Sequence, residues 1–247
     1  MRVSEVVTQE EWLAARRALL EREKELTRLR DAVAAERRSL PMVEVTADYV
    51  FDGTGGPARL ADLFEGRRQL LVYHFMFEPA WDAGCPSCTF IIDNVGHQSH
   101  LHARDTTLAL VSRAPLARLE AYRRRMGWDD ITWYSSGKSS FNLDYGVTID
   151  ATHRSYNFRD RSGEDGWVGW SGDMPGVSAF LRADDRIYHT YSAYERGVEP
   201  LMGTYVWLDL TALGRQEDWE QPPGNGDGNG MSWLHRHDEY PEPSPRS

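Results

Sequence analysis

Two cysteines that closely follow a buried apolar run constrain the fold of this chain more than any other feature. Residues 70–77 read LLVYHFMF, which is typical of a strand buried on both faces of a mixed or parallel sheet. The sequence Cys85-Pro86-Ser87-Cys88 follows a short loop later. With Cys85 at a helix N-cap, Pro86 takes the first helical position, where a missing N–H removes no hydrogen bond. We therefore predict a strand that leads into a helix, with the two cysteines at the start of that helix.

The spacing of the cysteines predicts a redox-active dithiol. Cys85 and Cys88 would lie on the same side of the first helical turn, so their sulfurs could meet as a disulfide. The positive end of the helix favours a thiolate at Cys85, and the thiolate is the attacking species; Cys88 would then resolve the mixed disulfide. These are the only cysteines of the chain, so they cannot join distant segments as in a secreted disulfide scaffold. Thiol–disulfide exchange is the predicted function.

Two other interpretations of the cysteine pair stay open. Both residues could be small core side chains without reactivity. Together with His97 and His100 they also spell C-x2-C-x8-H-x2-H, a possible zinc site. A helix that continued to His97 would place its ring about 13 Å from Cys88, too far for one tetrahedral metal. Zinc therefore requires the helix to break near Asn94 or Gly96, and we predict no metal.

The surrounding pattern predicts an α/β fold with a partly parallel sheet. A second buried strand is expected over residues 106–112, and a helix over 116–126 that Gly127 closes. A strand–helix–strand order of this kind makes a βαβ unit. Alternating apolar residues in 177–182 and 187–192 then predict a β-hairpin.

The N-terminal residues 1–41 are predicted to form a helical arm. A helix is expected over residues 9–39, because Thr8 and Glu11 form a capping-box pattern at its start. Its apolar seam is too narrow for a confident coiled coil, so we expect it to pack against its own domain or a partner subunit, which allows a homodimer. The seam recurs every seven residues: Trp12, Leu19, Leu26, Val33 and Leu40.

Residues 42–220 are predicted to form one domain, in which 128–176 is a loop-rich insertion and part of 194–210 is helical. Residues 221–247 are predicted to be a flexible linker and a tail that docks through Trp233 and Tyr240. The aromatic residues of the insertion are expected in the core rather than over the dithiol. They are Tyr134, Tyr145, Tyr156, Trp167 and Trp170.

Composition excludes several classes of partner. The formal net charge is −10 and no long basic run occurs, so nucleic acid is not an expected partner. No apolar stretch approaches the ~18 residues of a membrane span, and the N-terminus lacks the apolar run of a signal peptide, so we expect a cytoplasmic protein. No glycine-rich phosphate loop follows a strand, so no organic cofactor is expected. The expected partner is a protein or small-molecule thiol or disulfide.

Motifs along nearly the whole chain resemble one family. The segments LLVYHFMF, GCPSC, HARDTTLALVSRAPLARLEAYRRRMGW, SFNLDYGV and HRHDEY are similar to those of the thioredoxin-like proteins catalogued as domain of unknown function 899. The resemblance implies a thioredoxin-like fold and the activity of a dithiol–disulfide oxidoreductase. It also implies a relation to the alkyl-hydroperoxide-reductase and thiol-specific-antioxidant proteins.

The chain departs from better-known relatives around the motif. Peroxiredoxins carry a Pro and a Thr or Ser at fixed positions before the peroxidatic Cys, whereas here Pro79 lies six residues before Cys85 and Asp82 lies three before. This departure puts peroxidase activity in doubt, although a thiol peroxidase stays the main alternative enzyme. Thioredoxin has Trp directly before its first Cys; here Gly84 holds that position and Trp81 lies four residues before Cys85.

Two further residues are expected to support the dithiol. The resemblance implies a cis-proline beside it, and Pro175, before the strand at 177–182, is the best match, with a cis Met174–Pro175 bond. Arg113 follows the second buried strand, at the sheet edge where ligand sites of α/β proteins lie. From there its guanidinium could lower the pKa of Cys85.

Overall fold

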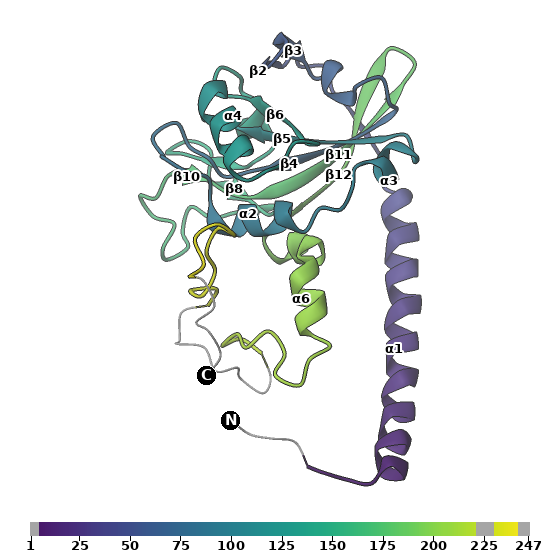
Figure 1. Ribbon diagram of the computed structural model, residues 1–247. Helices are drawn as coiled ribbons and strands as arrows, with labels where there is room; N and C mark the ends of the chain where they lie inside the picture. The colour runs from purple at the N-terminus through teal and green to yellow at the C-terminus, as the bar shows by residue number, and fades with distance from the viewer. Residues whose placement is uncertain (1–4, 221–229, 242–247) are drawn as a thin grey trace. The chain divides into compact units, whose positions relative to one another are not determined.

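The computed structural model describes residues 5–220 and 230–241, and the chain divides into two units, Met1–Met42 and Val43–Ser247 (Figure 1). The first unit consists of helix α1, Gln9–Arg38. The predicted capping box is confirmed: Thr8 Oγ1 accepts from the Glu11 N–H, and the Glu11 carboxylate accepts from the Thr8 N–H at 2.9 Å. No residue of α1 is buried within its own unit, so its apolar seam is exposed there.

An eight-stranded mixed sheet organises the second unit, in the order β1-β12-β11-β4-β5-β6-β2-β3. Its centre is parallel, because β4 pairs with β5 and β5 with β6 in the same direction. The β11–β12 hairpin adds to the other side of β4 in antiparallel fashion. The strands are β1 Val43–Glu44, β2 Val50–Gly53, β3 Gly56–Arg59, β4 Gln69–His74, β5 Thr106–Ser112, β6 Thr132–Ser135, β11 Gly176–Ala183 and β12 Arg186–Tyr194.

Short helices and two small antiparallel pairs complete this unit. Figure 1 shows them around the central strands β4, β5, β11 and β12. The helices are η1 Asp62–Phe64, α2 Pro86–Asp93, α3 Ser99–His102, α4 Leu116–Arg125, α5 Phe141–Asp144, η2 Glu195–Leu201 and α6 Gly203–Leu208. The pairs are β7 Thr148–Ile149 with β10 Gly172–Asp173, and β8 Ser155–Tyr156 with β9 Arg159–Asp160. None of the helices in the described ranges is long and apolar enough to span a membrane.

The connections place α2 and α4 on one face of the sheet. Both the β4–α2–β5 and the β5–α4–β6 crossovers step in the same direction along the sheet, and crossovers of one hand then carry their helices to the same side. On this face Tyr73, Leu110 and Trp133 pack with Ile91 of α2 and Tyr122 of α4. This core contains Cys88, so aromatic side chains of the sheet and of α4 hold the start of α2 in place.

The opposite face of the sheet has its own core. Because side chains alternate along a strand, Val72 and Ala109 point away from Tyr73 and Leu110. They pack with Phe64 of η1, Phe141 of α5 and other buried residues. Helices on both faces of a mixed sheet make the predicted thioredoxin-like α/β fold.

Three sequence-based boundaries differ from the structure. The predicted loop-rich insertion 128–176 contributes β6 to the central sheet. The apolar run at 70–77 is a strand only as far as His74. The helix expected within 194–210 is split into η2 and α6, with Pro200 inside η2, because proline lacks the N–H that a continuous helix needs. The predicted linker falls largely on residues 221–229, which lie outside the described residues.

Candidate active site

The cysteine motif lies where the sequence predicts, at the start of α2. Cys85 is the N-cap and Pro86 the first helical residue. The Cys85 carbonyl accepts the Thr89 N–H at 3.0 Å, which closes the first turn. Cys88 is buried, with 1% of its surface exposed, whereas Cys85 is partly exposed, and both are free thiols. Only the first of the two is therefore placed to meet a substrate.

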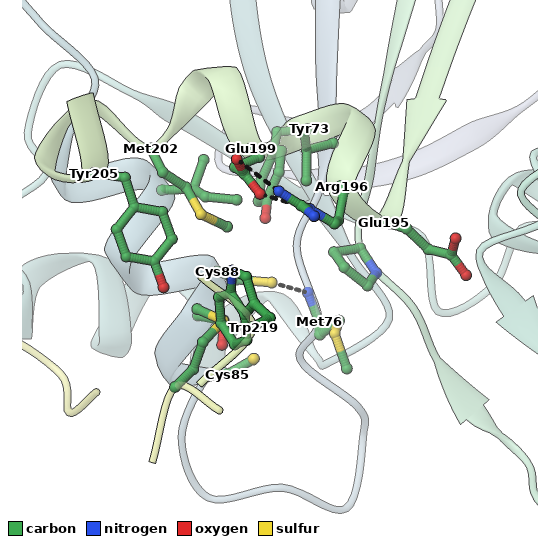
Figure 2. A pocket seen from close by; sticks show the side chains of 15 residues that line it. Tyr73, Met76, Cys85, Cys88, Glu195, Arg196, Glu199, Met202, Tyr205 and Trp219 are labelled. Carbon is green, nitrogen blue, oxygen red and sulfur yellow. Dashed lines mark hydrogen bonds and ion pairs between the residues drawn. The ribbon is translucent and has the colours of Figure 1, made fainter. Parts of the chain in front are cut away.

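The backbone of Met76 holds both cysteines in position. The Cys85 N–H donates to the Met76 carbonyl at 3.0 Å, and the Met76 N–H donates to the Cys88 Sγ at 3.4 Å (Figure 2). The preceding residue, Phe75, donates its N–H to the Val111 carbonyl and so continues the β4–β5 pairing by one residue. The central sheet thus sets the position of the dithiol.

The two thiols differ in acidity. A hydrogen bond from the Cys88 thiol is the largest cause that lowers the pKa of Cys85, and the backbone N–H groups of Cys88 and Ser87 add to it, against the effect of burial. Burial is the largest cause that raises the pKa of Cys88, and the neighbouring Cys85 adds to it. These opposite shifts favour the thiolate at Cys85 and the protonated thiol at Cys88.

This difference predicts the pH dependence of alkylation. The pKa of Cys85 is lowered to about 6, so its thiolate fraction rises through that pH and levels off near neutrality. An unperturbed cysteine would still be gaining thiolate above pH 8. We expect the iodoacetamide rate of the reduced protein, followed by peptide mass spectrometry, to show a midpoint near pH 6 at Cys85. A midpoint above pH 8 at Cys85, or faster modification of Cys88, would contradict the assigned roles.

Tyr73 of β4 belongs to this site, although sequence reasoning missed it. The residue is 1% exposed, and its hydroxyl has no nitrogen or oxygen partner among the described residues. Burial raises the pKa of Tyr73 well above its usual value, and Cys88 beside it raises it further. The one available signal was its position in a strand that leads into the motif. Its neutral hydroxyl therefore lies beside the Cys88 thiol.

A cavity of about 450 Å³ opens beside the dithiol (Figure 2). Both cysteines, Tyr73 and Met76 line it together with residues of η2 and α6. Pro175 lines the same cavity, as expected for a proline beside the dithiol; the cis form of its peptide bond stays a prediction. Trp219 and Met231 also line it.

The Arg113 side chain forms an ion pair with a carboxylate that the sequence analysis did not consider. Its Nε donates to Asp173 Oδ1 at 2.7 Å, and Thr148 donates to the same carboxylate oxygen. The largest effects that lower the pKa of Cys85 come from Cys88 and Ser87 rather than from this guanidinium. The expectation did not include Asp173, a buried carboxylate that the β7–β10 pair brings to Arg113.

The position directly before the motif, Gly84, has no room for a side chain. A Cβ at this position would lie 2.5 Å from Phe75 Cε1 and 3.1 Å from Tyr122 Cε1, so no larger residue fits without displacement. The Trp81 side chain instead packs at the edge of the core that contains Cys88, and its carbonyl accepts from Arg118 at 2.6 Å.

The C-terminal tail reaches the motif. Arg236 donates from Nη2 and Nε to the Gly84 carbonyl at 2.6 and 2.9 Å, one residue before Cys85. His237 Nδ1 lies 2.9 Å from the Asp93 carboxylate at the end of α2. Both contacts join residues more than 140 positions apart in the chain, so no local pattern pointed to them.

The tail contacts the domain, as predicted, through Trp233, but Leu234 takes the place of the second predicted anchor, Tyr240. Leu234 is buried against Phe90 and Tyr205, and Trp233 Nε1 donates to the buried Glu217 at 2.8 Å. Tyr240 is largely exposed, and its ring packs on His235 within the tail. The predicted role of Tyr240 is therefore wrong, because a shorter aliphatic residue fills the space beside α2.

The zinc alternative finds no ligand group. Helix α2 ends at Asp93, so the break that the alternative requires is present. Nevertheless, His97 Nδ1 accepts from the Ser99 N–H at 3.2 Å and its Nε2 lies 3.9 Å from Asp130, and residues 5–220 and 230–241 contain no group of three or more His, Cys, Asp or Glu arranged to hold a metal.

The aromatic residues of the insertion 128–176 were predicted to lie in the core, and the structure agrees in part. Tyr134 and Tyr156 are buried core residues, whereas Trp170 is exposed.

Solved structures with a similar course of the chain include peroxiredoxins. A cysteine-to-serine mutant of Xanthomonas campestris peroxiredoxin Q is 12% identical, with a TM-score of 0.47, covering 69% of this chain and 97% of that one. Peroxidoxin BcpB from Mycobacterium tuberculosis is 13% identical, with a TM-score of 0.44, covering 67% and 95%. At these values the likeness carries no conclusion about activity.

One family matches this chain at the level of sequence. No curated protein matches the chain. The family model described as "Bacterial protein of unknown function (DUF899)" matches residues 1–240, which include α1, the dithiol and the docked tail. The chain therefore belongs to the DUF899 family of bacterial proteins.

Proposed function

We propose that this protein is a thiol–disulfide oxidoreductase that works through Cys85 and Cys88. The observation that carries the proposal is the asymmetry of the pair: a partly exposed Cys85 at a helix N-cap with a lowered pKa, against a buried Cys88 with a raised one. A nucleophile and a resolving thiol need this difference. Two inert core cysteines would both be buried and protonated.

The reaction consists of two exchanges. The Cys85 thiolate attacks one sulfur of a substrate disulfide, so a Cys85–substrate disulfide forms and the second substrate sulfur leaves and takes a proton. Cys88, beside the Tyr73 hydroxyl, then attacks the Cys85 sulfur. Its proton passes to the first substrate sulfur, which leaves as a thiol, and the Cys85–Cys88 disulfide remains. Two electrons have passed to the substrate, and an external dithiol returns them.

A redox titration tests this proposal. The protein is equilibrated with mixtures of reduced and oxidised dithiothreitol, its free thiols are alkylated under acid quench, and intact masses are recorded. We expect a reversible two-electron transition in which both thiols disappear together. Reversible oxidation by hydroperoxide but not by disulfides, through a sulfenic acid at Cys85 that condenses with Cys88, would instead support the thiol peroxidase. Absence of any reversible oxidation would contradict both.

The setting of this reaction follows from its chemistry. A reductase of disulfides needs a supply of reduced thiols to return its electrons, so we place the protein in the cytoplasm, with protein or small-molecule disulfides as substrates. The exposed seam of α1 also favours a homodimer through this helix. Its members Trp12, Leu19 and Leu26 are all about half exposed.

A further inference from the structure

We propose that the cavity beside the dithiol binds the uncharged, apolar group of a small organic disulfide. This inference rests on the proposed function and adds a substrate class to it. Its basis is a set of three observations: the size and lining of the cavity, the pairing of every charge around it, and the position of the dithiol in its wall.

The cavity has the dimensions and surface of a small-molecule site. Its volume of about 450 Å³ falls in the range of roughly 300–1,000 Å³ in which pockets hold small ligands. Most of its lining is apolar or aromatic, with Ile91 of α2, Val198 of η2, and Trp219. Three methionines also contribute, Met76, Met202 and Met231, and their unbranched side chains adjust to ligands of different shape.

The charged residues at the cavity are already paired. Glu195 accepts from Asn157 at 2.6 Å and also pairs with Arg161. Glu199 binds Arg196 at 2.9 Å, drawn as a dashed line in Figure 2, and Arg215 at 2.8 Å. Arg196 is the one cationic residue among the described residues of the lining. A ligand carboxylate would lose hydration there without gaining a free cation, which disfavours charged disulfides such as oxidised glutathione.

The dithiol itself is part of the cavity lining. Cys85 and Cys88 line the cavity together with Met76, Met202 and Tyr205 (Figure 2). Tyr73 adds a buried hydroxyl without a nitrogen or oxygen partner in the described part of the chain. A substrate whose apolar group fills the cavity would therefore present its disulfide to Cys85. After the first exchange the sulfur attached to that group is bonded to Cys85, and the other half leaves as a thiol.

Two disulfides test this selectivity in the full-length protein. 4,4′-Dithiodipyridine is aromatic and uncharged, whereas oxidised glutathione is larger and carries carboxylates. Each second-order rate is divided by the rate of dithiothreitol with the same disulfide, which removes intrinsic reactivity. We expect the normalised rate for dithiodipyridine to be at least about tenfold higher, the ratio that burial of two methylene-sized groups produces. 4-Benzylpyridine, which has no disulfide, should compete with it.

A matched pair of variants locates the effect. Met202→Trp fills the cavity from the start of α6, whereas Val206→Trp places the same indole on the exposed side of that helix, where Val206 is 55% exposed. We expect Met202→Trp to lower the dithiodipyridine rate about tenfold, and Val206→Trp to leave it within about twofold. Iodoacetamide, which needs only the thiolate, should alkylate Cys85 at the same rate in both.

The outcomes separate this inference from the proposed function. Equal normalised rates for the two disulfides, without competition by 4-benzylpyridine, would overturn the substrate class and leave the oxidoreductase intact. An equal fall of the dithiodipyridine and iodoacetamide rates in Met202→Trp would also overturn it, because the indole would then act on the thiol alone. The competition assay on the unaltered protein decides the question if Met202→Trp does not fold. Loss of reversible dithiol oxidation would instead refute the proposed function itself.

Discussion

Replacing Cys88 by serine is expected to stop the reaction at the mixed disulfide, whereas replacing Cys85 should prevent its first step. In the Cys88→Ser variant the partly exposed Cys85 still attacks, but no thiol remains to displace the adduct. In Cys85→Ser the remaining thiol is 1% exposed and its pKa is raised by burial. Because the thiolate fraction falls about tenfold per unit of pKa, adduct formation at pH 7 should be slower by at least about 100-fold.

Intact-protein mass spectrometry measures this difference directly. Each variant is incubated with 2-hydroxyethyl disulfide, which is small and uncharged, and the adduct is counted against time. The double variant, with serine at both positions, controls for reaction elsewhere. Rapid adduct formation on Cys85→Ser and slow formation on Cys88→Ser would reverse the roles. Equally slow formation on both would favour the inert pair.

Deleting residues 231–247 is expected to lower the thermal stability of the protein strongly. The deletion removes Leu234 from its contacts with Phe90 and Tyr205, and leaves the buried Glu217 without its Trp233 partner. Loss of one buried leucine typically costs about 2–5 kcal/mol. For a protein of this size we expect the melting temperature to fall by about 5–10 °C. Differential scanning calorimetry measures it.

Two point variants sharpen this test. Leu234→Ala should reproduce much of the fall, because it removes the buried anchor alone. Tyr240→Ala should change the melting temperature little, since Tyr240 is 42% exposed and its ring packs only within the tail. An unchanged melt after the deletion would refute docking, and an effect of Tyr240→Ala as large as that of Leu234→Ala would restore the anchor predicted from the sequence.

Local features of the chain were readable because their causes are local. Thr8 and Glu11 cap α1 through hydrogen bonds over three residues. Pro86 suits the first position of α2 because the N–H that proline lacks has no partner in the first helical turn, which is also a local property. The continuous apolar run before the motif shows that both faces of this strand are buried, which can be read from the strand's own residues. The strand–helix–strand order likewise predicted a parallel pair, which β4 and β5 form.

The contacts around the dithiol depend on pairings that no local pattern contains. The sequence by itself determined the cysteine motif at a helix start, the central strands and the capped N-terminal helix. Only the tertiary structure decided that Tyr73 lies beside Cys88, that Arg113 binds Asp173, and that the tail reaches Gly84. The reason is physical: helix starts and strands arise from hydrogen bonds and side-chain alternation among neighbours, whereas the partner of a buried or charged side chain is whichever group the folded chain brings within reach. Arg236 and Gly84, separated by 152 positions, meet only after the sheet and α2 have formed a surface for the tail.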